Sequence, residues 1–134
     1  MRRLNRAGVL ALTSAAALAG SLLTSAPAQA ASSPIAACGS SYHVIDKHSL
    51  GGATVYLLYN GKTNCVVTWR NKPSSKRVYL KALIHRERQP WKVDGGKFTT
   101  YAGPVKIDAR GYCVQWGGDY GKKQWTSKFG HCGK

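Results

Sequence analysis

Short segments in which apolar and polar residues alternate dominate the chain and predict β-strands. Residues 54–59 alternate between two faces, with Val55 and Leu57 on one of them. Asn60-Gly61 follows, a dipeptide that favours the positive φ angles of a tight hairpin turn. Residues 65–69 then predict the returning strand, so we expect a β-hairpin in the middle of the chain.

A second segment, residues 105–110, alternates in the same way, and Gly111 separates it from residues 113–116. We expect a second, shorter hairpin there. The two returning strands share the motifs CVVTW and CVQW, and the tripeptides YHV and WKV precede the two hairpins at similar distances. This pattern indicates a duplicated unit of about 40 to 50 residues. Coincidental similarity between glycine-punctuated β-segments is the alternative.

These elements predict an all-β fold, either a small disulfide-stapled β-sandwich or a Greek-key barrel, and the duplication would give it two pseudo-repeated halves. Both architectures bury the apolar face of an antiparallel sheet. Residues 78–88 stay open between strand and helix, because Leu80, Leu83 and Ile84 have helical spacing as well as partial strand alternation.

The first 30 residues have the features of a secretory signal peptide. Arg2, Arg3 and Arg6 precede an apolar stretch over residues 7–23, and the sequence AQA at residues 28–30 is a small-residue cleavage site. We expect cleavage before Ala31, which leaves a single secreted β domain over residues 31–134. A retained membrane anchor is the alternative.

All four cysteines lie in the predicted mature chain. An even number of cysteines in a small exported domain predicts two disulfides, which offset the limited core of a chain of this size. Four cysteines allow three pairings. If each repeat closes its own loop, Cys38 pairs with Cys65 and Cys113 pairs with Cys132.

Acidic residues are scarce, which argues against most hydrolytic mechanisms. The chain has five Asp and Glu residues, and the surroundings of Asp94, Asp108 and Asp119 are those of turn or surface positions. We therefore expect no glycosidase with paired carboxylates. GxSxG and HExxH motifs are absent, and four paired cysteines leave no thiol nucleophile. The sequence predicts no catalytic residue, no enzyme activity and no cofactor.

Two local clusters of polar residues have side chains that could in principle carry chemistry. His43, Asp46 and His48 have metal-ligating side chains, but their spacing is unspecific on a strand or loop, so we predict no metal site. The segment HRER at residues 85–88 contains the residue types of a small secreted ribonuclease. Adjacent residues of a strand point to opposite faces, however, and no second catalytic partner is identified.

Positive charge is the strongest functional signal. The formal net charge is +15, and removal of the three signal-peptide arginines leaves about +12. Eight cations lie between residues 70 and 92, with Glu87 as their counter-charge. This imbalance predicts attraction to an anionic surface. The residues predicted to bind it are Lys72, Lys76, Arg77, Lys81, Arg86, Arg88 and Lys92.

Aromatic residues accompany the charge. Trp69 and Trp116 end corresponding strands of the predicted repeat, so we expect them in the core. Tyr120 and Trp125 lie beside the polar segment GKK and are the candidates for exposed contacts.

Five motifs are spread along nearly the whole predicted mature chain. They are CGSSYHVID from Cys38, GGATVYLLYN from Gly51, NCVVTWR from Asn64, WKVDGGKFTTYAGPVKI from Trp91 and CVQWGG from Cys113. Together they resemble the spore-associated protein A family of small secreted actinobacterial proteins. The resemblance implies a secreted protein on the surface of sporulating structures and provides no catalytic residue. Residues 70–92 are more basic than it implies.

The residues and the resemblance together predict a secreted, non-catalytic basic protein of the spore or cell-envelope surface. Its expected partner is an anionic cell-wall or spore-surface polymer or an acidic secreted protein, and nucleic acid would bind only as a non-specific polyanion. The second interpretation is a protein-binding adaptor or protease-inhibitor-like module of a secreted complex, which rests on architecture alone. A small secreted nuclease is the third.

Overall fold

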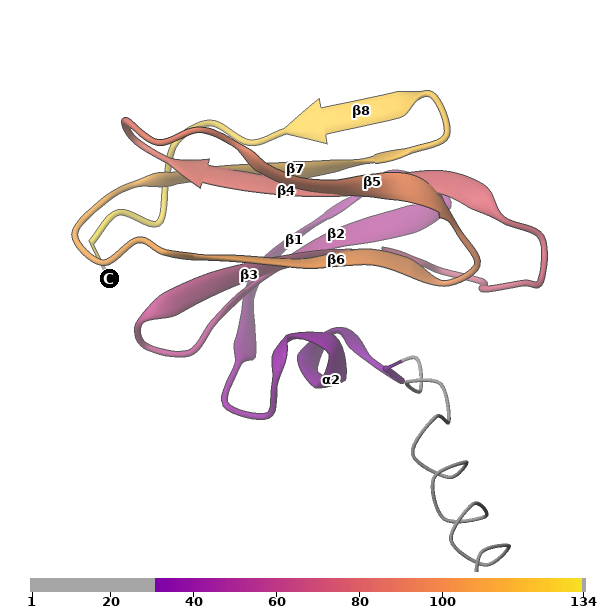
Figure 1. Ribbon diagram of the computed structural model, residues 1–134, viewed down its shortest axis with the longest axis horizontal. Helices are drawn as coiled ribbons and strands as arrows, with labels where there is room; N and C mark the ends of the chain where they lie inside the picture. Colours follow the sequence, from indigo (N-terminus) through magenta and orange to yellow (C-terminus); the bar gives the residue numbers. More distant parts are fainter. Residues whose placement is uncertain (1–30, 134) are drawn as a thin grey trace, which may run out of the picture. The chain divides into compact units, whose positions relative to one another are not determined.

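Two antiparallel β-sheets and one short helix make up the computed structural model, which describes residues 31–133 (Figure 1). The predicted signal peptide, residues 1–30, lies outside the described residues. Sheet A has the strand order β1-β2-β3-β6 and sheet B the order β5-β4-β7-β8. The elements are α2 (Pro34–Cys38), β1 (His43–Ser49), β2 (Ala53–Tyr59), β3 (Thr63–Arg70), β4 (Val78–Arg86), β5 (Lys92–Phe98), β6 (Tyr101–Asp108), β7 (Val114–Tyr120) and β8 (Lys123–Thr126).

This architecture confirms the all-β prediction and selects the sandwich over the barrel. Within the described residues the two sheets stay separate, and neither closes on itself. The first predicted hairpin is β2 and β3, which pair from Ala53 with Arg70 to Tyr59 with Asn64. Its turn is held by the side-chain oxygen of Asn60, which accepts hydrogen bonds from the backbone N–H of Lys62 and Thr63 at 3.0 and 2.7 Å.

The main core lies between the sheets. Alternate residues of β2 and β3, including Val55, Leu57 and Val66, point inward from sheet A. Alternate residues of β4 and β7, including Ile84 and Trp116, meet them from sheet B. Full burial of one such aliphatic side chain stabilises the fold by about 1.5–3 kcal/mol, so the period-two pattern provides the main driving force for folding.

A second, smaller core covers the outer face of sheet A. Leu58 and Val67 point away from the main core and pack with Cys65, Cys38 and Tyr42. Helix α2 lies over this face, so Figure 1 shows sheet B, sheet A and the helix as successive layers. No helix among the described residues is long and apolar enough to cross a membrane.

Both predicted disulfides are confirmed. Cys38 pairs with Cys65, which fastens α2 to β3, and Cys113 pairs with Cys132, which fastens the C-terminal segment to the start of β7. The two bonds close loops with sequence separations of 27 and 19 residues. In the chain-entropy account each loop of this size stabilises the fold by about 3 kcal/mol.

The predicted second hairpin is wrong. β6 pairs with β3 of sheet A, whereas β7 pairs with β4 and β8 of sheet B. The connection around Gly111 therefore crosses from one sheet to the other, with Ala109 buried at the crossing. Since β1, β2 and β3 share one sheet while β5, β6 and β7 do not, the strand pairing does not repeat between the two halves of the chain.

The open question over residues 78–88 is resolved in favour of a strand. Leu80 and Ile84 point into the main core, and Leu83 points to the outer face of sheet B. Leu83 is nevertheless only 8% exposed. An apolar residue buried on each face of one strand produces the spacing that also fits a helix.

The two sheets make a direct polar contact through Thr68. The hydroxyl of this fully buried residue of β3 donates a 2.7 Å hydrogen bond to the backbone oxygen of Lys81 in β4. Gly118 of β7 lies against the same point, and a Cβ there would collide with the Thr68 hydroxyl and lie 2.6 Å from the Lys81 oxygen. Only glycine leaves room for this approach.

Thr68→Val should therefore destabilise the fold although the two side chains have nearly the same shape. The substitution leaves the Lys81 carbonyl without its hydroxyl donor in the core, which costs about 1–3 kcal/mol. Equilibrium unfolding in urea measures the change. The exposed Thr126→Val is the matched control and should alter the free energy of unfolding by no more than about 0.5 kcal/mol. Equal stability of the two variants would contradict the role given to this hydrogen bond.

Candidate anion-binding site

The basic residues predicted from the sequence form two groups at opposite ends of β4. One is the loop cluster, Lys72, Lys76 and Arg77, in the loop before the strand; the other is the turn cluster, Arg86, Arg88 and Lys92, around the turn from β4 to β5. The nine residues of β4 separate the clusters by roughly 26 Å at about 3.3 Å per residue. The predicted residues are therefore not gathered on one face.

Two basic residues near these clusters have partners within the fold. Lys81, in the middle of β4, places Nζ 3.3 Å from Oδ2 of Asp119, so its charge is already paired. Arg70 donates from Nη1 to the backbone oxygens of Lys76 and Thr99 at 2.7 and 3.0 Å. Arg70 therefore shapes the loop that carries the loop cluster.

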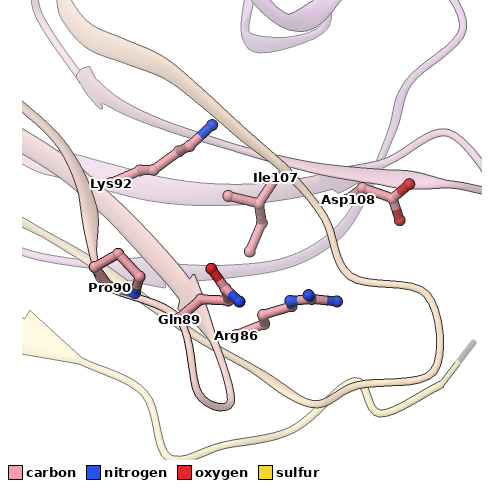
Figure 2. A pocket seen from close by; sticks show the side chains of 6 residues that line it. All are labelled: Arg86, Gln89, Pro90, Lys92, Ile107 and Asp108. Atoms are coloured by element: carbon pink, nitrogen blue, oxygen red, sulfur yellow. The ribbon is translucent and has the colours of Figure 1, made fainter.

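The turn cluster lies at a pocket of about 220 Å³ at the end of the sandwich. Figure 2 shows its lining, which is Arg86, Gln89, Pro90, Lys92, Ile107 and Asp108. Arg86 lies two residues beyond the buried Ile84, and Lys92 is the cross-strand partner of Ile84, so both side chains lie on the inner side of sheet B. Ile107 and Asp108 of β6 form the opposite wall.

Neighbouring groups hold both cations in place. The guanidinium carbon of Arg86 lies 4.0 Å from the centre of the Tyr112 ring, a cation–π contact that restrains the side chain. Lys92 donates from Nζ to the backbone oxygen of Lys106 at 3.2 Å. A cation that is already oriented loses less side-chain entropy when an anion binds.

Asp108 is the acidic residue of the pocket, and Arg110 counters its charge. The two side chains approach to 3.3 Å. The hydrogen bond from the backbone N–H of Arg110 lowers the pKa of Asp108 below its ordinary value. Desolvation opposes this effect, and the Arg110 guanidinium adds to it. Asp108 therefore stays ionised at neutral pH. Arg86, Lys92 and Arg110 together still leave this end of the molecule with an excess of positive charge.

The pocket has the chemistry to bind one anionic group. A guanidinium fixed by stacking can donate two parallel hydrogen bonds to a carboxylate or phosphate, and the lysine provides a second charge. The side chains of Pro90 and Ile107 form an apolar wall beside the cations, where charge interactions are screened less than in open water.

The residues considered for a nuclease site are engaged in other contacts. Nδ1 of His85 lies 3.0 Å from the backbone oxygen of Gln89, and Nε2 lies 2.8 Å from Oε1 of Gln115. The carboxylate of Glu87 accepts a 2.9 Å hydrogen bond from the backbone N–H of Cys113. Both side chains thus hold the turn and the strands around it together.

The residues considered for a metal site have separate contacts. Asp46 lies 2.9 Å from Nε2 of His131, and His48 stacks on Trp125 with ring centres 3.8 Å apart. The described residues contain no group of three or more His, Cys, Asp or Glu side chains that could hold a metal ion.

The aromatic candidates Tyr120 and Trp125 are half-buried and pack against the main core. Of the two tryptophans expected in the core, Trp116 is in the main core, whereas Trp69 stacks on Tyr101 on the outer face of sheet A. More exposed rings belong to residues that the sequence did not single out, namely Tyr79, Trp91, Tyr112 and Phe129. The position of Trp91 beside a charged turn was the available signal.

A curated relative decides the family of this chain. "Spore-associated protein A" of Streptomyces coelicolor (strain ATCC BAA-471 / A3(2) / M145) is 37% identical over 131 residues, which span 91% of this chain and 85% of the relative. The chain belongs to the spore-associated protein A family. No protein-family profile matches the chain, and no solved structure matches it.

Membership of the spore-associated protein A family confirms the resemblance seen in the sequence motifs. The name of the Streptomyces coelicolor relative concerns where that protein is found and specifies no ligand or reaction. The pocket at the β4–β5 end is therefore assigned from its own geometry.

The pocket predicts opposite effects of two substitutions on anion binding. Arg86→Ala should raise the Kd for inorganic polyphosphate about two- to five-fold at low ionic strength, because one cation of the pocket is lost. Asp108→Asn should lower the Kd, because it removes the negative charge beside the two cations. Titration calorimetry measures both. Lys122→Ala removes an exposed charge at the β7–β8 turn and should have a smaller effect than Arg86→Ala. Weaker binding by Asp108→Asn would contradict the assignment.

Proposed function

We propose that this member of the spore-associated protein A family is a secreted, non-catalytic protein that attaches to the spore or cell-envelope surface by binding an anionic polymer. The observation that carries the proposal is the pocket at the β4–β5 end, where Arg86 and Lys92 are pre-oriented beside an apolar wall. The loop cluster provides a second, weaker point of attraction at the other end of β4.

Three further observations support this function. The relative is named as spore-associated, which is consistent with a position at the spore surface. The two disulfides suit an oxidising environment outside the cell. The excess of 20 basic over five acidic residues in the full chain favours association with polyanions over a broad surface, while the pocket provides a defined contact.

Retention of the protein on spores or purified cell walls should decrease steeply as salt is raised. Exposed charges are screened over about 8 Å at physiological ionic strength and about 3 Å at 1 M, so the contacts of both clusters weaken together. Washing loaded spores with increasing sodium chloride and quantifying the released protein measures the effect. Equal retention in low and high salt would rule out an electrostatic attachment.

Two triple variants with the same change in charge separate the pocket from general charge. Replacing Arg86, Arg88 and Lys92 by alanine removes the turn cluster, and replacing Lys72, Lys76 and Arg77 removes the loop cluster. We expect the first variant to be released at clearly lower salt, because Arg86 and Lys92 of the turn cluster line the pocket with restrained side chains. Identical release profiles would show that net charge alone governs retention.

The competing functions predict different results in the same preparations. An adaptor or inhibitor would be recovered from culture fluid with a stoichiometric protein partner that remains bound in high salt. A nuclease would degrade RNA or DNA in a reaction abolished by Glu87→Gln. We expect neither outcome, because the carboxylate of Glu87 and both ring nitrogens of His85 are already engaged in contacts within the fold.

A further inference from the structure

The outer face of sheet B carries an exposed aromatic cluster next to the pocket. The ring of Trp91 stacks on His85 with centres 3.9 Å apart, and Phe129 packs on the same histidine at 5.2 Å. We call Trp91, His85 and Phe129 the aromatic platform. Val93, which shares its face with Trp91, extends the platform along β5.

The platform is rigid although it is exposed. The two ring nitrogens of His85 lie 3.0 Å from the backbone oxygen of Gln89 and 2.8 Å from Oε1 of Gln115, so the ring lies between two acceptor oxygens. The amide nitrogen of Gln115 donates a 2.9 Å hydrogen bond to the backbone oxygen of Ser127. One face of Trp91 is covered by His85, and the residue is still 38% exposed. The accessible part of the Trp91 ring is therefore the side away from the protein.

A stacking site for a ring-shaped ligand explains these features best. Phe129 and Val93 are 46% and 51% exposed, which is an unfavourable arrangement in water unless a partner covers them. An aromatic side chain has only about 150–250 Å² of surface in total, so the exposed parts fall well short of the roughly 800 Å² per partner that a stable protein interface buries. A small flat apolar surface fits one or two ligand rings.

The position of the platform relative to the pocket selects the kind of ring. Gln89, Pro90 and Lys92 line the pocket, and Trp91 lies between them in the sequence with its ring on the other face of the sheet. A polymer that crosses this turn would meet an aromatic ring and then a pair of cations. A pyranose ring has an apolar C–H face for stacking, and a carboxylate on a neighbouring sugar would be attracted to the pocket that Arg86 and Lys92 line.

We propose that the aromatic platform and the pocket together bind an acidic polysaccharide, with sugar rings stacked on Trp91 and acidic groups held by Arg86 and Lys92. This inference rests on the proposed function and names the class of its anionic polymer. Nucleic acid fits less well. A base stacked on Trp91 would bring its own phosphate to the outer face of sheet B, where it would need a free cation. On that face of sheet B the cation of β4 is Lys81, which is already paired with Asp119 at 3.3 Å.

Binding of the purified mature protein to two polymers tests the proposal. Polygalacturonate has carboxylates on pyranose rings, and inorganic polyphosphate has charge without rings. Trp91→Ala should raise the Kd for polygalacturonate about two- to ten-fold, the range for one aromatic contact, and leave the Kd for polyphosphate unchanged. Trp91→Phe, which keeps a ring, should retain most of the affinity and shows that any loss comes from the missing ring.

Tyr79→Ala is the matched control, since Tyr79 is 37% exposed on the same face at the other end of β4. It should leave both Kd values unchanged. Unchanged polygalacturonate binding by Trp91→Ala, or equal losses for both polymers, would overturn the role of the platform. Single-stranded poly(dT) binding that is tighter than polygalacturonate binding and depends on Trp91 would overturn the assignment to a glycan.

The same measurements separate this inference from the proposed function. A protein that binds polyphosphate but not polygalacturonate would retain an anion-binding function and lose the glycan platform. A protein that binds neither polymer at low ionic strength would refute the proposed function, and the inference would fail with it.

Discussion

The contact between Thr68 and the Lys81 carbonyl constrains the rest of the sandwich. It places a buried donor of β3 opposite a backbone acceptor of β4 at 2.7 Å, so it sets the separation and alignment of the two sheets at this point. Gly118 completes the contact because any side chain there would occupy the same space. Apolar residues around this point can be replaced by other apolar residues of similar volume. The hydrogen bond has no such substitute.

The position of the pocket follows from this contact. The contact fixes the backbone of Lys81 over β3, and every second residue of β4 then points inward. Ile84 is one of these inward residues, with Lys92 of β5 beside it on the same face. Arg86 is the next residue of β4 on that face. Arg86 lies beyond the end of the core, where it faces Ile107 and Asp108 at the end of β6 across the pocket. A cation is tolerated there because water reaches the open end of the sandwich.

The sequence allowed accurate prediction of features that depend on local periodicity. Alternation identified β2 and β3. The assumption that each half of the chain closes its own loop gave the correct disulfides, although the strand pairing of the two halves does not repeat. The same alternation could not distinguish a hairpin from a crossing between sheets, because β6 and β7 have inward and outward faces in either arrangement. The positions of the charges along residues 70–92 likewise did not show that the two basic clusters lie at opposite ends of a nine-residue strand. The exposed ring of Trp91 could not be predicted, because its stacking on His85 joins residues six positions apart across the β4–β5 turn.

The turn between β4 and β5 combines the features that argue for binding rather than catalysis. Catalytic acid–base groups need a free proton site near the reacting atom, yet His85 and Glu87 use theirs to fix Gln89, Gln115 and Cys113. The effect of these bonds is to hold Trp91 on one side of the turn and Arg86 on the other. An aromatic ring and two cations set on the two sides of one turn are the arrangement on which the proposed binding of a charged polymer rests.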